Sequence, residues 1–292
     1  MISLYTKKCR LLPLQFILPV FILLAFILLS CKSNREYGSP PTYNLNHPYV
    51  IKLPSELDEI SGITYYGKDN SLFAESDDKG GLYKIFLNKP TDIRKWKFSH
   101  KRNYEDIVLH DSIFYVLNNN GDIVTLTFLK DSLIDQNYKF PDQGKNEFES
   151  LYYDDTLQKL VLICKDCEAD KKAAVSAFSF DTKQHTFDNL YTIDADKVVE
   201  KTSPNSNRYK PSGAAVNPVT GELYILSSIN KLLVVAERNG KIKEMYHLDP
   251  SLFNQPEGIA FMPNGNLFIS NEAGNLHPAT ILFYQFKNAE NK

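Results

Sequence analysis

Short apolar segments recur along the chain from about residue 60 onward, and turns separate them. Five segments share one pattern: a small or acidic residue, a short apolar strand, a tight turn, and a second apolar strand. They start at Ser61, Glu105, Glu149, Ser212 and Glu257, at intervals of 44, 44, 63 and 45 residues. The long interval holds a polar insertion near 197–211. A nearly fixed period of this length indicates a repeat architecture.

The pattern of apolar and polar residues within each repeat predicts a unit of up to four strands. The second strands, such as 223–227, are almost wholly apolar, which is typical of strands covered on both faces. The turn at 263–266 contains Asn-Gly, a strong hairpin signal. A third strand follows in every repeat, and a more polar fourth strand, such as 242–248, follows in four of them. Four antiparallel strands per period predict a β-propeller blade, whereas a two-sheet β-sandwich would not explain the period.

The two ends of the repeat region predict how the ring closes. The fifth repeat ends after its third strand near Phe286, and residues 49–53, ahead of the first repeat, have strand character. We therefore expect an all-β, five-bladed β-propeller of four-stranded antiparallel blades over residues 49–288. The N-terminal strand would complete the last blade and remove the exposed edges of an open array.

The first thirty residues differ in composition from the repeats. Basic residues within 7–10 precede an uncharged apolar run, 11–29, which ends just before Cys31. This order resembles a bacterial lipoprotein signal, in which Cys31 carries the lipid and becomes the first residue after cleavage. We expect a signal peptide over 1–30, a lipidated cysteine with a flexible tether over 31–48, and attachment to a membrane of the bacterial cell envelope. A plain cleaved signal and a membrane helix are the alternatives.

Composition and charge exclude some classes of partner. Hydrophobic residues make up 43% of the chain and charged residues 23%, which is typical of a globular protein and not of a disordered one. The formal net charge is −2 at pH 7, so charge does not favour nucleic acid as a partner. We expect a monomer, and composition identifies neither a protein partner nor a small-molecule ligand.

The first residue of each repeat has an oxygen-bearing side chain, and the repeat pattern predicts that these side chains lie close together. The innermost strand of a propeller blade begins each repeat, so the repeat-start residues should form a ring at the axis. Three carboxylates on a narrow ring repel one another unless they are protonated, paired or bridged by a cation. Oxygen ligands in flexible geometry favour Ca²⁺. We predict calcium ligands at Glu149, Glu257, Glu105, Asn271 and Asn118, and further carboxylates nearby at Glu59, Asp77, Asp106 and Glu272. The alternatives are carboxylates that cap backbone amides, and an organic ligand.

Cys164 and Cys167 are the cysteines that remain once Cys9 leaves with the signal and Cys31 carries the lipid. Their spacing occurs in redox proteins and in half of a zinc site. The chain offers neither a βαβ unit around the pair nor a second cysteine or histidine pair with metal-ligand spacing. We expect a small disulfide at a strand end.

The repeat starts also resemble a known family. The segments are EISGI at 59–63, YEDI at 104–107, FESL at 148–151, PSGA at 211–214 and QPEGIA at 255–260. Their order is similar to that of the SdiA-regulated family, also called YjiK/CarP-like, over about residues 49–288. The resemblance implies an envelope-anchored five-bladed propeller, related to the NHL and strictosidine-synthase-like propellers, with a calcium site in at least one member. It favours Glu149 and Glu257 as ligands first, and then Glu105.

Two classes of function are compatible with these observations. The first is a non-catalytic binding, scaffolding or regulatory propeller in which calcium is structural or regulatory. The second is a calcium-dependent hydrolase of the phytase or lactonase type, in which the metal would polarise an oxygen and activate water. Phosphate hydrolysis needs basic residues near the metal, and Lys165 and Lys210 are the nearest candidates. The small number of such residues favours binding.

Overall fold

Five four-stranded antiparallel sheets make up the computed structural model, and each of the first four takes its strands from consecutive positions in the chain. The structure describes residues 37–76, 80–98, 103–142, 144–170, 174–200, 208–275 and 277–287. The expected signal peptide, Cys31 and Asp77 lie outside these residues. In the part of the chain that is described, no helix has the length and hydropathy needed to span a bilayer.

Within the described residues, the strands and two short helices have the following bounds. Blade 1 contains β2 (Ile60–Tyr66), β3 (Ser71–Ser76), β4 (Gly81–Phe86) and β5 (Ile93–Lys97). Blade 2 contains β6 (Tyr104–His110), β7 (Ile113–Asn118), β8 (Ile123–Leu129) and β9 (Ser132–Tyr138). Blade 3 contains β10 (Asn146–Asp154), β11 (Lys159–Cys167), β12 (Ala174–Phe180) and β13 (Phe187–Asp194). Blade 4 contains β14 (Gly213–Val216), β15 (Leu223–Ser227), β16 (Leu232–Ala236) and β17 (Ile242–His247). Blade 5 contains β18 (Pro256–Phe261), β19 (Leu267–Asn271), β20 (Thr280–Tyr284) and β1 (Tyr49–Lys52), and the helices are η1 (Ser55–Leu57) and α2 (Ala195–Val199).

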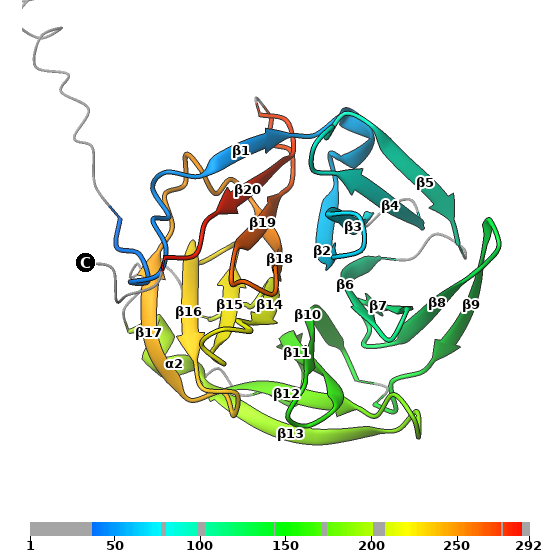
Figure 1. The fold of residues 1–292 in the computed structure, drawn as a ribbon. Coiled ribbons are helices and arrows are strands. Elements are labelled where there is room, and N and C mark those ends of the chain that lie inside the picture. Colours follow the sequence, from blue (N-terminus) through cyan, green and yellow to red (C-terminus); the bar gives the residue numbers. More distant parts are fainter. Residues whose placement is uncertain are drawn as a thin grey trace, which may run out of the picture. The chain divides into compact units, whose positions relative to one another are not determined.

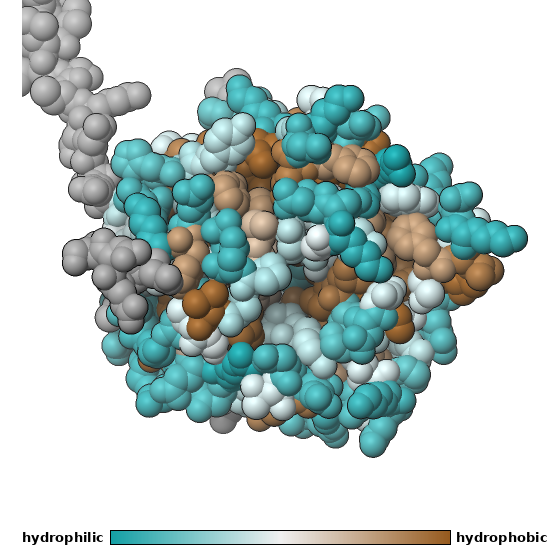
Figure 2. Space-filling view, in the orientation of Figure 1, coloured by the Kyte–Doolittle hydropathy of each residue, from teal (hydrophilic) through white to brown (hydrophobic). Residues whose placement is uncertain are grey.

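The blades surround a common axis, which confirms the predicted five-bladed propeller (Figure 1). The first strand of blades 1 to 4 and β18 of blade 5 lie innermost, and each of them contacts the next around the ring. The ring closes as expected, because β1 pairs antiparallel with β20 and places Ile51 opposite Ile281. Hydrophilic side chains predominate on the face shown in Figure 2, with hydrophobic residues between them.

The hydrophobic core is divided into five clusters, one between each pair of neighbouring blades. Strand β15 shows why the second strands are apolar throughout. Its residues Leu223 and Ile225 pack toward blade 3, whereas Tyr224 and Leu226 pack toward blade 5. Both faces of the strand are thus buried, and each fully buried large apolar side chain contributes about 1.5–3 kcal/mol.

Part of the expected tether is folded. Tyr43 and Leu45 are buried in the cluster between blades 4 and 5. The Tyr43 hydroxyl donates to the Gly265 carbonyl at 2.6 Å and accepts from the Asn217 amide at 2.9 Å. The expectation of a flexible tether up to residue 48 is therefore wrong for this stretch, because an aromatic and an aliphatic side chain among its polar residues anchor it to the blades.

Candidate functional site

Most repeat-start residues sit at irregularities in the innermost strands. The register of β6 against β7 shifts between Tyr104 and Asp106, at Glu105, and that of β10 against β11 shifts between Phe148 and Ser150, at Glu149. Corresponding register shifts occur at Glu257 in β18 and at Ser61 in β2. In blade 4, Ser212 directly precedes β14. A β-bulge takes a residue out of the ladder and re-aims its side chain. The side chains at these positions can therefore point toward the axis.

All five repeat-start residues line one cavity of 260 Å³. The register thus brought together the residues that the sequence pattern singled out, including three of the five predicted calcium ligands. The complete lining is Ser61, Glu105, Glu149, Lys165, Lys210, Ser212, Ser228, Ile229, Gln255, Glu257 and Glu272. With four carboxylates and two ammonium groups, the lining has a formal charge of −2. We refer to this space as the axial cavity.

Asn118 and Asn271, the other two predicted ligands, do not line the axial cavity. Both are buried at the ends of second strands, one strand further from the axis. The Asn271 amide donates to the Leu252 carbonyl at 3.3 Å and to the Thr280 hydroxyl at 3.2 Å. The structure therefore does not bring these two residues into the axial cavity with the glutamates, because the second strand lies one strand further from the axis than the bulged inner strand.

The two lysines of the axial cavity are engaged in ion pairs. The Lys165 ammonium contacts the carboxylate of Glu149, and both side chains are mostly buried. Lys210 pairs with Asp166 at 2.8 Å, and Arg208 approaches the same carboxylate at 2.6 Å. The cavity therefore contains its own positive charges, which partly neutralise the carboxylates.

Burial and neighbouring charges shift the pKa values of three residues that line the cavity, Glu257, Glu149 and Lys165. Burial raises the pKa of Glu257 well above the ordinary value, and the neighbouring carboxylates of Glu149 and Glu272 raise it further. Burial also raises the pKa of Glu149, although Lys165 opposes this shift. For Lys165, burial alone lowers the pKa, but the surrounding carboxylates, Glu149 foremost, outweigh burial and raise it. A cation in this cavity would therefore favour the ionised form of Glu257.

Residues next to the repeat starts join the inner strands of neighbouring blades. The buried Asp106 carboxylate accepts backbone N–H groups of Leu151 at 2.7 Å and of Ile107 at 2.8 Å. Asp106, the residue that follows Glu105, thus caps backbone amides in the way considered for the ring glutamates. A Cβ atom added to Gly213 would lie 2.0 Å from the carbonyl oxygen of Glu257, so only glycine fits this approach of two blades.

Cys164 and Cys167 form a disulfide at the end of β11, with Cα atoms 6.0 Å apart. The two residues that they enclose are Lys165, which lines the axial cavity, and Asp166, which binds Lys210. The sulfur atoms also lie near the Asp170 carboxylate, within 4.8 Å, but their covalent bond to each other removes them as metal ligands.

Sequence reasoning named some of the lining residues and missed others. It named Lys165 and Lys210 as basic candidates and Glu272 as a nearby carboxylate. It missed Ser228, Ile229 and Gln255 as lining residues, which lie in connections between strands. Two signals were present: Ser228 directly follows an apolar second strand, and Gln255 opens the repeat-start segment QPEGIA.

The fold and site define a five-bladed propeller with an acidic cavity at one end of its axis. The family model described as SdiA-regulated matches residues 43–287, and the chain belongs to this family. A comparison with curated protein sequences found no match.

Solved structures share the fold at low sequence identity. Glutaminyl cyclase of Myxococcus xanthus is 12% identical, with a TM-score of 0.55 over 83% of this chain and 97% of that one. Regucalcin of Agrobacterium tumefaciens, a calcium-binding protein, is 11% identical, with a TM-score of 0.51 over 85% of this chain and 95% of that one. PQQ-bound aldose sugar dehydrogenase of Streptomyces coelicolor is 10% identical, with a TM-score of 0.51 over 82% and 99%. At these identities the likeness concerns the fold alone.

Proposed function

We propose that this chain is a calcium-binding propeller, held at the bacterial envelope by a lipid on Cys31, that acts by binding and not by catalysis. One observation carries the calcium proposal. The carboxylates of Glu105, Glu149, Glu257 and Glu272 line a single small cavity whose formal charge is negative. Partly buried carboxylates in such proximity are stabilised by a bound cation.

The donor set fits a hard divalent cation. The axial cavity offers carboxylate oxygens and the hydroxyls of Ser61, Ser212 and Ser228, with no histidine and no free thiol among its lining residues. Such oxygen ligands suit Ca²⁺, which tolerates irregular geometry better than Mg²⁺. Lys165 competes for the same oxygens, because its ammonium contacts Glu149. We therefore expect calcium to bind by displacing this ammonium from Glu149.

Thermal melting of the purified protein tests the proposal. After chelation, added calcium should raise the melting temperature more than added magnesium. If the ion binds only the folded state, calcium at 100 times its Kd adds about 2.7 kcal/mol of stability. The double variant Glu149→Gln with Glu257→Gln should lose this gain, whereas Glu237→Gln, on an exposed loop paired with Lys241, should keep it. An equal calcium effect in the double variant would contradict the site.

A calcium-dependent hydrolase is the second candidate, because two lysines line the axial cavity and could neutralise a phosphate. Both lysines, however, are already paired with carboxylates, Lys165 with Glu149 and Lys210 with Asp166. This pairing favours the binding role. Phosphoester and lactone assays with calcium present distinguish the two, since a hydrolase should lose turnover in the same double variant.

A further inference from the structure

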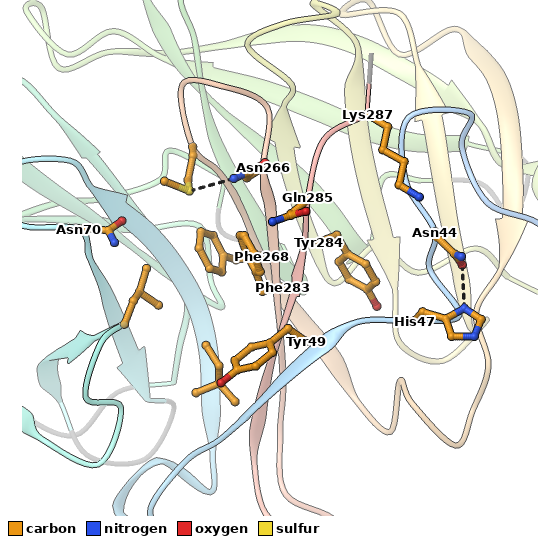
Figure 3. Close-up of a pocket in the computed structure, with 13 residues that line it drawn as sticks. Asn44, His47, Tyr49, Asn70, Asn266, Phe268, Phe283, Tyr284, Gln285 and Lys287 are labelled. Atoms are coloured by element: carbon orange, nitrogen blue, oxygen red, sulfur yellow. Dashed lines mark hydrogen bonds between the residues drawn. The ribbon is translucent and has the colours of Figure 1, made fainter. Parts of the chain in front are cut away.

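A second cavity, of 620 Å³, lies where blade 5 meets blade 1 and the segment that leads into β1 (Figure 3). We call it the seam cleft. It shares no lining residue with the axial cavity and falls in the size range of small-molecule sites. Its lining is Asn44, His47, Tyr49, Ile51, Asn70, Leu87, Met262, Asn266, Phe268, Phe283, Tyr284, Gln285 and Lys287.

Aromatic rings form the apolar part of the seam cleft. The rings of Phe268 and Phe283 lie 5.0 Å apart between their centroids. Tyr49 comes from the edge strand β1, and 70% of the residue is exposed. Figure 3 shows these three rings in the cleft, with the amides of Asn266 and Gln285 next to the two phenylalanines. The cleft therefore offers flat apolar surfaces beside hydrogen-bonding groups.

The polar part consists mainly of side-chain amides. The carbonyl oxygen of Asn266 accepts the backbone N–H of Phe286 at 3.0 Å, and that of Asn70 accepts the Tyr65 hydroxyl at 3.0 Å. These contacts fix the two amides. The NH₂ group of Asn266 also donates to the Met262 sulfur at 3.7 Å, a weak contact that uses only one of its two hydrogens, so both amides retain donors for a ligand. The Gln285 amide makes no hydrogen bond within the described residues and is exposed. No aspartate or glutamate is among the lining residues.

We infer that the seam cleft binds a saccharide. A sugar ring presents C–H faces that pack on aromatic rings, and its hydroxyl and acetamido oxygens accept hydrogen bonds from amide donors. A purely apolar ligand would leave the amides unpaired on binding, which costs free energy. A metal ion would find no carboxylate here. The combination of the exposed Tyr49, the buried Phe268 beside the partly buried Phe283, and neutral amides therefore favours a polyhydroxylated, largely uncharged ligand.

Saturation-transfer NMR and titration with chitotetraose, cellotetraose and maltotetraose test this inference, in the presence of a chelator so that the result is independent of calcium. We expect at least one of these probes to bind. Tyr49→Ala and Gln285→Leu should each weaken that binding about tenfold, which corresponds to about 1.4 kcal/mol. Tyr49→Phe retains the ring and should keep most of the affinity. Gln136→Leu, an exposed amide on β9 in blade 2, is the matched control and should have no effect.

Three results would overturn the saccharide site. The first is the absence of binding by all three probes at millimolar concentration. The second is binding that Tyr49→Ala and Gln285→Leu leave unchanged, which would place the ligand elsewhere. The third is an equal loss in Gln136→Leu, which would indicate a nonspecific effect. Melting curves of each variant verify that the propeller is folded, as expected for side chains exposed at the surface.

Discussion

Lys165 on β11 directs its ammonium to the carboxylate of Glu149 on the adjacent strand β10. The two side chains are only 22% and 15% exposed, so little water screens the pair. The same ammonium is attracted by Glu257 and Glu105, and these interactions raise the pKa of Lys165 despite its burial. The acidic axial cavity thus carries a cation supplied by the chain itself.

Removal of this internal cation should strengthen calcium binding. In Lys165→Gln the ring carboxylates lose their competing ammonium, so we expect calcium affinity to rise about tenfold by isothermal titration. Lys243→Gln is the matched control, because Lys243 also pairs with a glutamate, Glu222, but far from the cavity lining. Unchanged binding in Lys165→Gln would show that the lysine does not compete with calcium, and weaker binding would show that it helps to hold the ligand.

The close approach of blades 4 and 5 should make Gly213 intolerant of a side chain. Gly213→Ala places a methyl group against the Glu257 carbonyl and should destabilise the protein by about 1–3 kcal/mol or more in denaturant unfolding. Gly38→Ala is the control, since its added Cβ meets nothing closer than 3.6 Å. It should change stability by less than about 0.5 kcal/mol. Equal stabilities of the two variants would refute this packing of the inner strands.

Asp166 should contribute stability that depends on pH. Its hydrogen bond with Lys210 and the nearby Arg208 lower the pKa of this carboxyl below its ordinary value of 3.8. The folded state therefore favours the ionised form, and the stabilisation is present above pH 3.8 and is lost as the pH falls through the folded-state pKa.

Thermal melting from neutral pH down to about pH 2 measures this effect. Asp166→Asn should melt below the wild type at neutral pH, and the difference should shrink under acid. Asp131→Asn, in an exposed turn with no ion pair among the described residues, should match the wild type throughout. A difference that stays constant with pH would mean that the loss is not electrostatic.

The proposed lipid anchor can be tested through Cys31. Cys31→Ser removes the thiol that would carry the lipid, so we expect the protein to shift from the membrane fraction to the soluble fraction after cell fractionation. Labelled palmitate should be incorporated by the wild type and not by the variant. Palmitate incorporation into Cys31→Ser would contradict Cys31 as the lipidated residue, and unchanged membrane association without palmitate would favour the alternative of an uncleaved membrane helix.

The architecture could be predicted because its determinants are local and repeated. Each blade needs two apolar strands joined by a turn, and strands such as β15 show their burial on both faces through continuous hydrophobicity. The ring of repeat-start residues followed from the same register. The N-terminal strand was predicted because the last repeat lacked a fourth strand, and β1 supplies it.

The details of the site depended on features that no pattern encodes. The bulges at Glu105 and Glu149 turn these residues out of the ladder, whereas Asn118 and Asn271 sit on strands further from the axis. The pairing of Lys165 with Glu149 depends on the register between β10 and β11, which shifts on both sides of Phe148. Such shifts place an extra residue in one strand of a pair and do not appear in the periodicity of one strand.

An anomalous difference map from crystals grown with calcium tests the central claim most directly. We predict a single strong peak in the axial cavity, within coordination distance, about 2.3–2.6 Å, of carboxylate oxygens of Glu149 and Glu257. The Lys165 ammonium should then have moved away from Glu149. A cavity without a peak at saturating calcium, with Lys165 still paired to Glu149, would contradict the calcium site and leave the lysine as the permanent counter-ion of the ring.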